Sequence, residues 1–260
     1  MELTILKKIE EKLSQGERGA LVTVTGATGS TPRKSGTIMG VFKDELVGTI
    51  GGGKIESVVI DRARQLLETG ESENFEYNLT TTDELQMNCG GTMKGFIKVF
   101  SPFPKLLICG AGHVGQKLFK VTKTLDFDLK IIDDREELKF DIPELTLGNF
   151  KDILTKERID GNTYIVIVTR GHLLDEEVLN LVKNRGAKYI GIIGSRRKIT
   201  TLKENLEKVG KIEDNIYAPI GLKLSNGTPE EIAIEILAEI LKIKNGGELV
   251  HRTMFHNKYI

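Results

Sequence analysis

Short apolar runs alternate with segments of helical spacing along the second half of the chain. Strands are expected near Ile216 and at four longer apolar runs, Lys105–Cys109, Leu129–Ile132, Tyr164–Thr169 and Tyr189–Ile193. After the first run, Leu118, Phe119 and Leu125 recur at helical spacing. Strands that alternate with helices favour a parallel sheet covered on both faces. The pattern therefore predicts a parallel-sheet α/β domain over residues 103–243.

The first hundred residues mix helical and strand patterns irregularly. A helix is expected at Leu3–Ser14, with Leu6, Ile9 and Leu13 on one face. The other expected elements are a strand, a hairpin, a helix and two more strands: Ala20–Gly26, Thr37–Val41 with Leu46–Ile50, Lys54–Glu68, Phe75–Leu79 and Gly95–Phe100. This mixture predicts a smaller α+β domain over residues 1–102, placed before the parallel-sheet domain.

Prolines and glycines indicate where the two domains end. Ser101-Pro102-Phe103-Pro104 interrupts regular structure and is the expected boundary. The last helix is expected to begin at Thr228 as N-cap, with Pro229 in its first turn and Glu231 completing a capping box. Residues 244–260 are polar and are predicted to form a C-terminal tail.

Composition narrows the class of protein. Lys plus Arg and Asp plus Glu both number 37, so no net charge draws the chain to nucleic acid or an anionic membrane. No segment approaches the roughly 20 apolar residues of a membrane span, and the N-terminus has the pattern of an amphipathic helix rather than of a secretion signal. Two cysteines without a paired framework fit a reducing compartment. We expect a cytoplasmic protein with no nucleic-acid and no membrane partner.

A glycine-rich turn follows the first apolar strand of the second half. Gly110-Ala111-Gly112-His113-Val114-Gly115 fits the Gly-x-Gly-x-x-Gly pattern between a strand and a helix. In such turns the first glycine permits the tight turn, the second lets the backbone approach a pyrophosphate, and the third lets the helix pack on the strand. Asp133, at the end of the next strand, is placed to accept from a ribose hydroxyl. The arrangement predicts a Rossmann-like domain and leaves open whether that domain binds a dinucleotide.

Two further segments are expected at the same edge of the sheet, because ligands bind beyond the carboxyl ends of parallel strands. These segments are Thr169-Arg170-Gly171-His172 and Gly194-Ser195-Arg196-Arg197-Lys198. In the second, Ser195 is the expected N-cap and three cations follow it. Such a helix start suits the recognition of an anion, or is a solvated basic surface.

Two of the four histidines, His113 and His172, fall at predicted strand ends and are candidate functional residues. Asp175 lies three residues after His172, where it can pair with the histidine or cap the helix. Neither histidine has a carboxylate or thiolate at the spacing of a metal site, so no metal site is predicted.

Three loops of the first half carry residues suited to a ligand. Gly51-Gly52-Gly53 lies between a strand and a helix, where it forms either an N–H nest for an anion or a tight connection. Cys89, in the long loop over Thr80–Thr92, is a candidate soft ligand or sulfur nucleophile, whereas Cys109 ends a core strand and is expected only to pack. Arg33 adds a cation if these loops converge.

Several of these segments occur in one order along the chain. They are Gly29-Ser30-Thr31-Pro32-Arg33, Ile50-Gly51-Gly52-Gly53 with Glu56, Cys89-Gly90-Gly91, Gly110–Gly115, Asp133-Asp134-Arg135, Thr169–His172 with Asp175, Tyr189-Ile190-Gly191 with Gly194–Lys198, Ala218–Leu222 and Thr228–Ala233. In this order they resemble the motifs of the XdhC/CoxI family, accessory proteins of molybdenum hydroxylases such as xanthine dehydrogenase. The resemblance covers about residues 16–242, and Leu224-Ser225-Asn226-Gly227 departs from the family's pattern.

The resemblance implies that the chain binds the molybdenum cofactor (molybdopterin), protects it, supports its sulfuration and delivers it to an apo-hydroxylase. Family members are similar to chaperones rather than to turnover enzymes. The implied partners are an apo-molybdenum hydroxylase client and a cysteine desulfurase, and a homo-oligomer is expected.

The predicted site combines the residues singled out above. The cofactor-binding residues are Arg33, Gly51, Gly52, Gly53, Gly90, Gly91, Gly110, Gly112, Gly115, Asp133, Arg170, Ser195, Arg196 and Arg197. The candidate chemical residues are Cys89, for contact with sulfur or the metal, His113 and His172.

An NAD-dependent oxidoreductase is the alternative hypothesis. Asp133 would then bind the ribose, and His172 or His113 would donate a proton. An acid at the end of the second strand favours NAD over NADP. A nucleotide-sensing adaptor, in which the ligand only biases assembly with a partner, is a third class.

Overall fold

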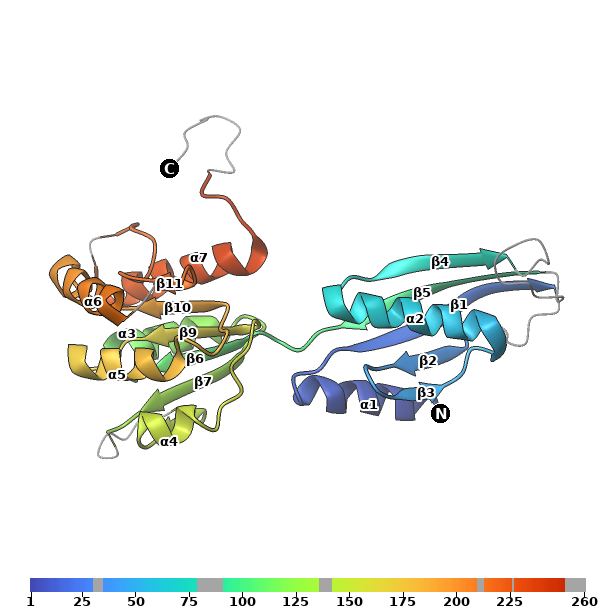
Figure 1. Cartoon of the computed structure of the whole chain (residues 1–260), viewed down its shortest axis with the longest axis horizontal. Coiled ribbons are helices and arrows are strands. Elements are labelled where there is room, and N and C mark those ends of the chain that lie inside the picture. The colour runs from blue at the N-terminus through green and yellow to red at the C-terminus, as the bar shows by residue number, and fades with distance from the viewer. Residues whose placement is uncertain (30–34, 79–90, 136–141, 210–212, 226, 251–260) are drawn as a thin grey trace. The chain divides into compact units, whose positions relative to one another are not determined.

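The computed structural model describes residues 1–29, 35–78, 91–135, 142–209, 213–225 and 227–250 (Figure 1). The chain divides into two units, Met1–Phe103 and Pro104–Ile260. Each unit has its own sheet and its own hydrophobic cores. None of the helices in the described part of the chain has the length and apolar content that crossing a bilayer requires.

The first unit is built on a five-stranded antiparallel sheet with the order β3-β2-β1-β5-β4. The strands are β1 (Gly19–Gly29), β2 (Ile38–Val41), β3 (Leu46–Gly48), β4 (Glu73–Asn78) and β5 (Gly91–Phe100). The predicted hairpin is confirmed, since β2 and β3 pair with Val41 opposite Leu46. Gly95 lies in β5 opposite Phe75 of β4, and a Cβ on it would overlap the Phe75 ring, so the ring can lie over this position only because the residue is glycine.

Two helices cover opposite faces of this sheet. Helix α2 (Gly53–Thr69) packs Ile55, Val59 and Ala63 onto the face that carries Val22. Helix α1 (Glu2–Ser14) covers part of the other face, which carries Leu21, because successive side chains of a strand point to opposite sides.

The predicted apolar face of α1 was wrong in one position. Ile5 and Ile9 are the buried residues of this helix, and they pack with Phe42. Leu6 is 49% exposed, although it was expected beside Ile9. Ile5 lies against Gly40 and Gly48 of the hairpin, so the helix is rotated toward the strands that have no side chain at these two points.

The second unit is a six-stranded sheet with the order β11-β10-β9-β6-β7-β8, and every pair in it is parallel. The strands are β6 (Lys105–Cys109), β7 (Asp128–Asp133), β8 (Leu145–Leu147), β9 (Thr163–Ile167), β10 (Tyr189–Ile192) and β11 (Ile216–Tyr217). Counted from β6 as strand 1, the order is 3-2-1-4-5-6, that of a dinucleotide-binding Rossmann sheet. The predicted Rossmann-like fold is confirmed.

Helices cover both faces of this parallel sheet (Figure 1). Leu106 and Ile108 of β6 face α3 (His113–Thr122) and α7 (Pro229–Asn245). Leu107 and Cys109 face the other layer, formed by α4 (Phe150–Leu154), α5 (His172–Val182) and α6 (Arg196–Val209). Burial on both faces explains why these strands are continuous apolar runs rather than alternating ones.

The sequence predicted the start of α7 correctly but did not reveal strand β8. The capping box of α7 is confirmed, because the Thr228 side chain accepts from the Glu231 N–H and the Glu231 side chain accepts from the Thr228 N–H. Strand β8, Leu145–Leu147, was missed. It has three residues at the edge of the sheet, and so short a run shows no periodicity.

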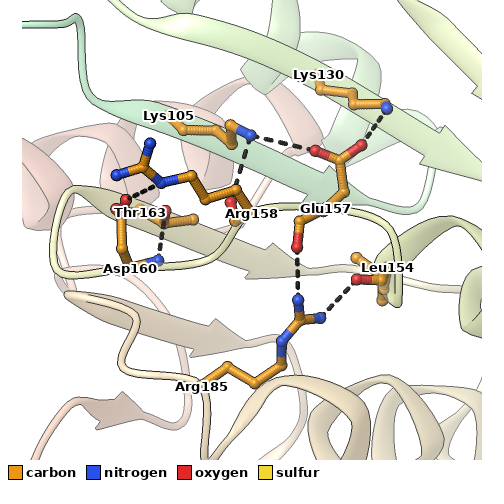
Figure 2. A network of polar contacts seen from close by, with 8 residues as sticks. All are labelled: Lys105, Lys130, Leu154, Glu157, Arg158, Asp160, Thr163 and Arg185. Atoms are coloured by element: carbon orange, nitrogen blue, oxygen red, sulfur yellow. Dashed lines mark hydrogen bonds and ion pairs between the residues drawn. The ribbon is translucent and has the colours of Figure 1, made fainter. Parts of the chain in front are cut away.

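A network of charged residues ties the amino ends of the central strands together (Figure 2). The carboxylate of Glu157 accepts from Lys105 of β6 and Lys130 of β7. The guanidinium of Arg185 donates to the backbone carbonyls of Leu154 and Glu157. The network therefore fixes the α4–β9 connection against two strands and against the end of α5.

Burial raises the pKa of Glu157, but hydrogen bonds from Lys130 and Lys105 outweigh it, and the pKa lies below its ordinary value. The carboxylate is 14% exposed, so water screens these contacts only in part. A carboxylate whose pKa falls on folding stabilises the fold fully above its ordinary pKa of 4.5. That stabilisation is lost as the pH drops through the lowered value.

Replacing Glu157 with glutamine is expected to lower the free energy of unfolding by about 1–2 kcal/mol at pH 7, because two partly buried lysines lose their counter-charge. The difference from the wild type should shrink as the pH falls below 4.5. Urea unfolding followed by circular dichroism measures it. Glu204→Gln, on the exposed side of α6, is the matched control and should change stability little. Equal losses for both variants would contradict a structural role for the network.

Candidate functional site

The carboxyl ends of β6, β7, β9 and β10 form the edge at which a Rossmann sheet binds its ligand. The strand order reverses between β6 and β9, and ligands lie at this switch point in open parallel sheets. We call this edge, with residues 109–113, 133–135, 168–172 and 193–198, the switch-point edge. The predicted residues of the second half, Gly110 to Gly115, Asp133, Arg170, His172 and Ser195 to Arg197, all belong to it or to the first turn of α3.

The three glycines of the first turn have different surroundings. Gly110 has a φ of 117°, and a Cβ built on it would lie 2.4 Å from the carbonyl oxygen of Val168. A Cβ on Gly115 would lie 1.9 Å from the carbonyl oxygen of Gly110. A Cβ on Gly112 would meet nothing within 4 Å. Gly110 and Gly115 therefore allow the backbone to fold on itself, whereas the space at Gly112 is open to a ligand.

Helix α3 begins beside this open space without a side-chain cap. Gly112 is its N-cap, no side chain caps it, and no acid lies in its first turn. The first N–H groups of a helix are unpaired and carry partial positive charge, which suits an anion. His113 is the first residue of α3 and is exposed.

Asp133 is held by the protein itself. Its carboxylate accepts from the Ala111 N–H at 2.7 Å, and from the Arg135 N–H, Nε and Nη2 at 3.0, 2.8 and 2.8 Å. Its side chain is 3% exposed. Burial raises the pKa of Asp133, but the bonds from Arg135 and Ala111 outweigh it, so the pKa is lowered. These contacts fix the glycine turn to the end of β7, and the ribose contact of Asp133 stays a prediction.

Asp175 joins the two other loops of the switch-point edge. Its carboxylate accepts from the Thr169 N–H at 3.1 Å and from the Thr169 hydroxyl, and it forms an ion pair with Lys198. Lys198 also donates to the Ile193 carbonyl at 3.1 Å. Asp175 is 1% exposed and does not bond His172, which is exposed. The possible pairing of His172 with Asp175 is therefore not formed.

The basic start of α6 is smaller than predicted. Ser195 is its N-cap, since its hydroxyl lies 3.4 Å from the Lys198 N–H. Lys198 turns inward to Asp175, so only Arg196 and Arg197 remain exposed at this helix start. These two arginines are the exposed cations of this loop.

Arg170 forms an ion pair across the end of β6. Its Nη2 lies 2.9 Å from Oδ2 of Asp134. Arg170 follows β9 and Asp134 follows β7, and these strands flank β6 on its two sides. The side chains are 55% and 23% exposed, respectively.

The glycine-rich loop of the first unit is an N–H nest that already holds an anion. Gly51, Gly52 and Gly53 all have positive φ. The carboxylate of Glu56 accepts from the N–H groups of Ile50 and Gly52, both at 2.9 Å, and from the Thr49 hydroxyl. Burial raises the pKa of Glu56, but these bonds, that of Thr49 first, outweigh it and the pKa is lowered.

The other predicted residues of the first unit lie mostly outside the described residues. Arg33, Cys89 and Gly90 belong to the segments 30–34 and 79–90, and Gly91 begins β5. Cys109 is completely buried at the end of β6, and burial, followed by the charge of Asp175, raises the pKa of its thiol to about 12. It therefore stays a protonated packing residue, as expected.

Sequence reasoning missed three separate ion pairs at this edge, Asp175 with Lys198, Asp134 with Arg170 and Asp133 with Arg135. Each of these residues lies within three residues of a predicted loop, but spacing does not tell which side chain turns inward. Across the described residues, His, Cys, Asp and Glu nowhere gather in a group of three that would hold a metal ion.

Two family models match this chain. The model of the XdhC Rossmann domain matches residues 106–240, and the model of the XdhC and CoxI family matches residues 13–78. The first of these covers more than half of the chain and includes the whole switch-point edge.

Three curated proteins are similar to this chain in sequence. The uncharacterized protein YqeB of Escherichia coli K12 is 32% identical over 237 residues, 87% of this chain and 43% of that protein. A probable subunit of xanthine dehydrogenase from Bacillus subtilis 168 is 25% identical over 158 residues, 59% of this chain and 47% of that protein. The chain thus spans less than half the length of these two relatives. The molybdenum cofactor insertion chaperone PaoD of E. coli K12 is 21% identical over 298 residues, 93% of this chain and 88% of that protein.

Solved structures with a similar fold include one that aligns along almost the whole chain. The crystal structure of a xanthine dehydrogenase from Bacillus halodurans aligns with a TM-score of 0.51 and 21% identity. The alignment covers 96% of this chain and 97% of that one. At this identity the likeness supports the fold alone.

The glycines of the first turn give a matched pair of variants. Gly115→Ala is expected to lower the free energy of unfolding by about 3 kcal/mol or more, because its methyl group would overlap a backbone oxygen. Gly112→Ala should change it by less than about 0.5 kcal/mol, because the methyl group meets open space at a φ of −70°. Thermal unfolding measures both. A destabilised Gly112→Ala protein would show that the space is needed for folding rather than for a ligand.

Proposed function

Because the chain belongs to the XdhC and CoxI family, we propose that it binds the molybdenum cofactor and delivers it to an apo-hydroxylase similar to xanthine dehydrogenase. The open space at Gly112, at the uncapped start of α3, is the observation on which this proposal depends. It is supported by the similarity to a molybdenum cofactor insertion chaperone along most of both chains. The proposed place of action is the cytoplasm.

The described residues fit the phosphorylated part of this cofactor. The N–H groups at the start of α3 would hold a phosphate, with Gly112 allowing the close approach. Arg170, Arg196 and Arg197 are exposed around the same edge and would supply counter-charge. The bound cofactor supplies the molybdenum centre that the client needs, and the residues of this chain bind, orient and shield it.

The Gly51–Gly53 nest has a narrower part in the proposal. Glu56 already occupies its N–H groups, so the loop keeps a fixed backbone shape within the first unit and is not proposed to bind the phosphate. Support of sulfuration, contact of Cys89 with sulfur or molybdenum, and a cysteine desulfurase partner rest on the sequence motifs alone.

An NAD-dependent oxidoreductase remains the second candidate, because the strand order is that of dinucleotide-binding sheets. The contacts of Asp133 weigh against it. Its carboxylate accepts four bonds from Ala111 and Arg135 and would have to release at least one to bind a ribose. A reaction of its own is therefore not part of the leading proposal.

Incubation with the isolated cofactor, followed by desalting and measurement of bound molybdenum and pterin, tests the leading proposal. Wild-type protein is expected to retain both, and Gly112→Ala to retain about tenfold less, because its methyl group would fill the approach to α3. Gly161→Ala is the matched control, since a Cβ at Gly161 also meets open space. Gly161 lies before β9, at the edge of the sheet opposite to the switch-point edge. Retention no greater than by serum albumin would reject the proposal, and retention of NADH instead would favour the oxidoreductase.

Exchange of Cys89 for serine tests the sulfur role. The variant is expected to retain the cofactor but to activate the client hydroxylase several-fold less, because serine cannot carry or contact transferable sulfur as a thiolate does. Client activity after cofactor transfer is the measurement, with Cys109→Ser as the comparison for loss of a buried thiol. Unchanged activation by Cys89→Ser would remove this residue from the mechanism.

A further inference from the structure

The ion pair between Asp134 and Arg170 spans the place where the proposed ligand would lie. The two residues follow β7 and β9, which are separated by β6 and so lie about 10 Å apart. Their side chains meet at 2.9 Å. The pair therefore crosses the carboxyl end of β6, from which the chain enters the Gly110–Gly115 turn.

Asp134 differs from the other two acids of this edge in its hydrogen-bond partner. Asp133 and Asp175 are buried and accept from backbone N–H groups of Ala111 and Thr169, so they fix loops. Asp134 is partly exposed, and among the described residues its bonding partner is the side chain of Arg170. Within the described part of the chain it accepts from no backbone N–H group and holds one guanidinium in place.

The guanidinium of Arg170 is suited to a different partner. Arginine binds phosphate through two parallel bonds, and a doubly charged phosphate is a stronger acceptor than one carboxylate. The start of α3 attracts an anion to the same side of the sheet. The ion pair with Asp134 is largely exposed on its arginine side, and exposed pairs are weak. A phosphorylated ligand can therefore replace Asp134 at little cost.

We propose that Asp134 is a built-in competitor, which holds Arg170 across the switch-point edge in the free protein and releases it to a phosphate-bearing ligand. The inference rests on the proposed function, because it assumes that this edge takes a phosphorylated ligand. In the free protein the pair closes over the turn. In the complex Arg170 contacts the phosphate, and Asp134 turns to solvent.

The competitor makes binding selective for charge. A ligand without phosphate cannot take Arg170 from Asp134, so it gains nothing from opening the pair. A ligand with a phosphate group gains the arginine and opens the ion pair in the same step. When the ligand leaves, the Asp134–Arg170 ion pair forms again. The free protein and the complex therefore differ in the partner of Arg170, which is Asp134 in one and the phosphate in the other.

A double-mutant cycle with ADP, pyrophosphate and adenosine as probes tests the inference. Titration calorimetry at one low ionic strength would compare the wild type, Asp134→Asn, Arg170→Gln and the double variant. Asp134→Asn is expected to bind ADP and pyrophosphate about two- to fivefold more tightly, the effect of removing one exposed ion pair. Arg170→Gln should bind them more weakly, and adenosine should bind all four proteins alike.

The cycle separates competition from simple charge repulsion. If Asp134 acts through Arg170, its replacement has no effect in the Arg170→Gln protein. Equal tightening in both backgrounds would overturn the inference, because Asp134 would then act only as a negative charge. Glu177→Gln removes one exposed charge from α5, away from the pair, and should leave ADP binding unchanged.

The two proposals fail in different ways. If the wild type binds ADP and retains the cofactor but Asp134→Asn binds ADP no more tightly, only the competitor is rejected. If the wild type retains the cofactor and binds no ADP or pyrophosphate at millimolar concentration, the competitor is rejected and the carrier function stands. If it retains neither, both are rejected.

Discussion

Buried or partly buried carboxylates that accept backbone N–H groups hold several of the described loops of this protein in shape. Glu56 fixes the glycine loop before α2, Asp133 the turn before α3, and Asp175 the loop before α5. Glu235 and Glu239 do the same for the connection to α7, where they accept from Ser225 and Gly221. A buried carboxylate is costly unless it is bonded, and so are unpaired loop N–H groups. Each contact removes both costs and ties a loop to a helix or strand.

The same contacts separate loops that are complete from loops that remain open. The Gly51–Gly53 nest and the Gly110–Gly115 turn look alike as sequences, because both are glycine-rich and lie between a strand and a helix. Glu56 fills the first with an internal anion, whereas Asp133 binds only Ala111 in the second and leaves the start of α3 without a cap. The first loop is therefore filled by an internal carboxylate, whereas the second has no such acid at the start of its helix.

Much of the fold followed from the sequence, because buried parallel strands and a capping box have strong local patterns. Strand β6 was predicted residue for residue, and Thr228 with Glu231 marked the start of α7. What failed depends on contacts distant in sequence. Leu6 is exposed because α1 turns Ile5, rather than Leu6, toward the glycines of the hairpin. Lys198 is not part of the exposed basic cluster because it forms an ion pair with the buried Asp175. Helical spacing does not report the partner on another element, so the site could be located at an edge but its bonds could not be assigned.

The position of β6 has a consequence for motion at the switch-point edge. This strand is paired on both sides, buried on both faces and anchored at its amino end through Lys105. Opening it requires global unfolding, so the Gly110 turn that leaves it stands on the most persistent part of the unit. Arg170 and Asp134, by contrast, are joined by side chains alone and can separate on the nanosecond scale of exposed rotamers. The switch-point edge thus combines a turn that stays fixed for the lifetime of the fold with an ion pair that breaks and re-forms on a far shorter timescale.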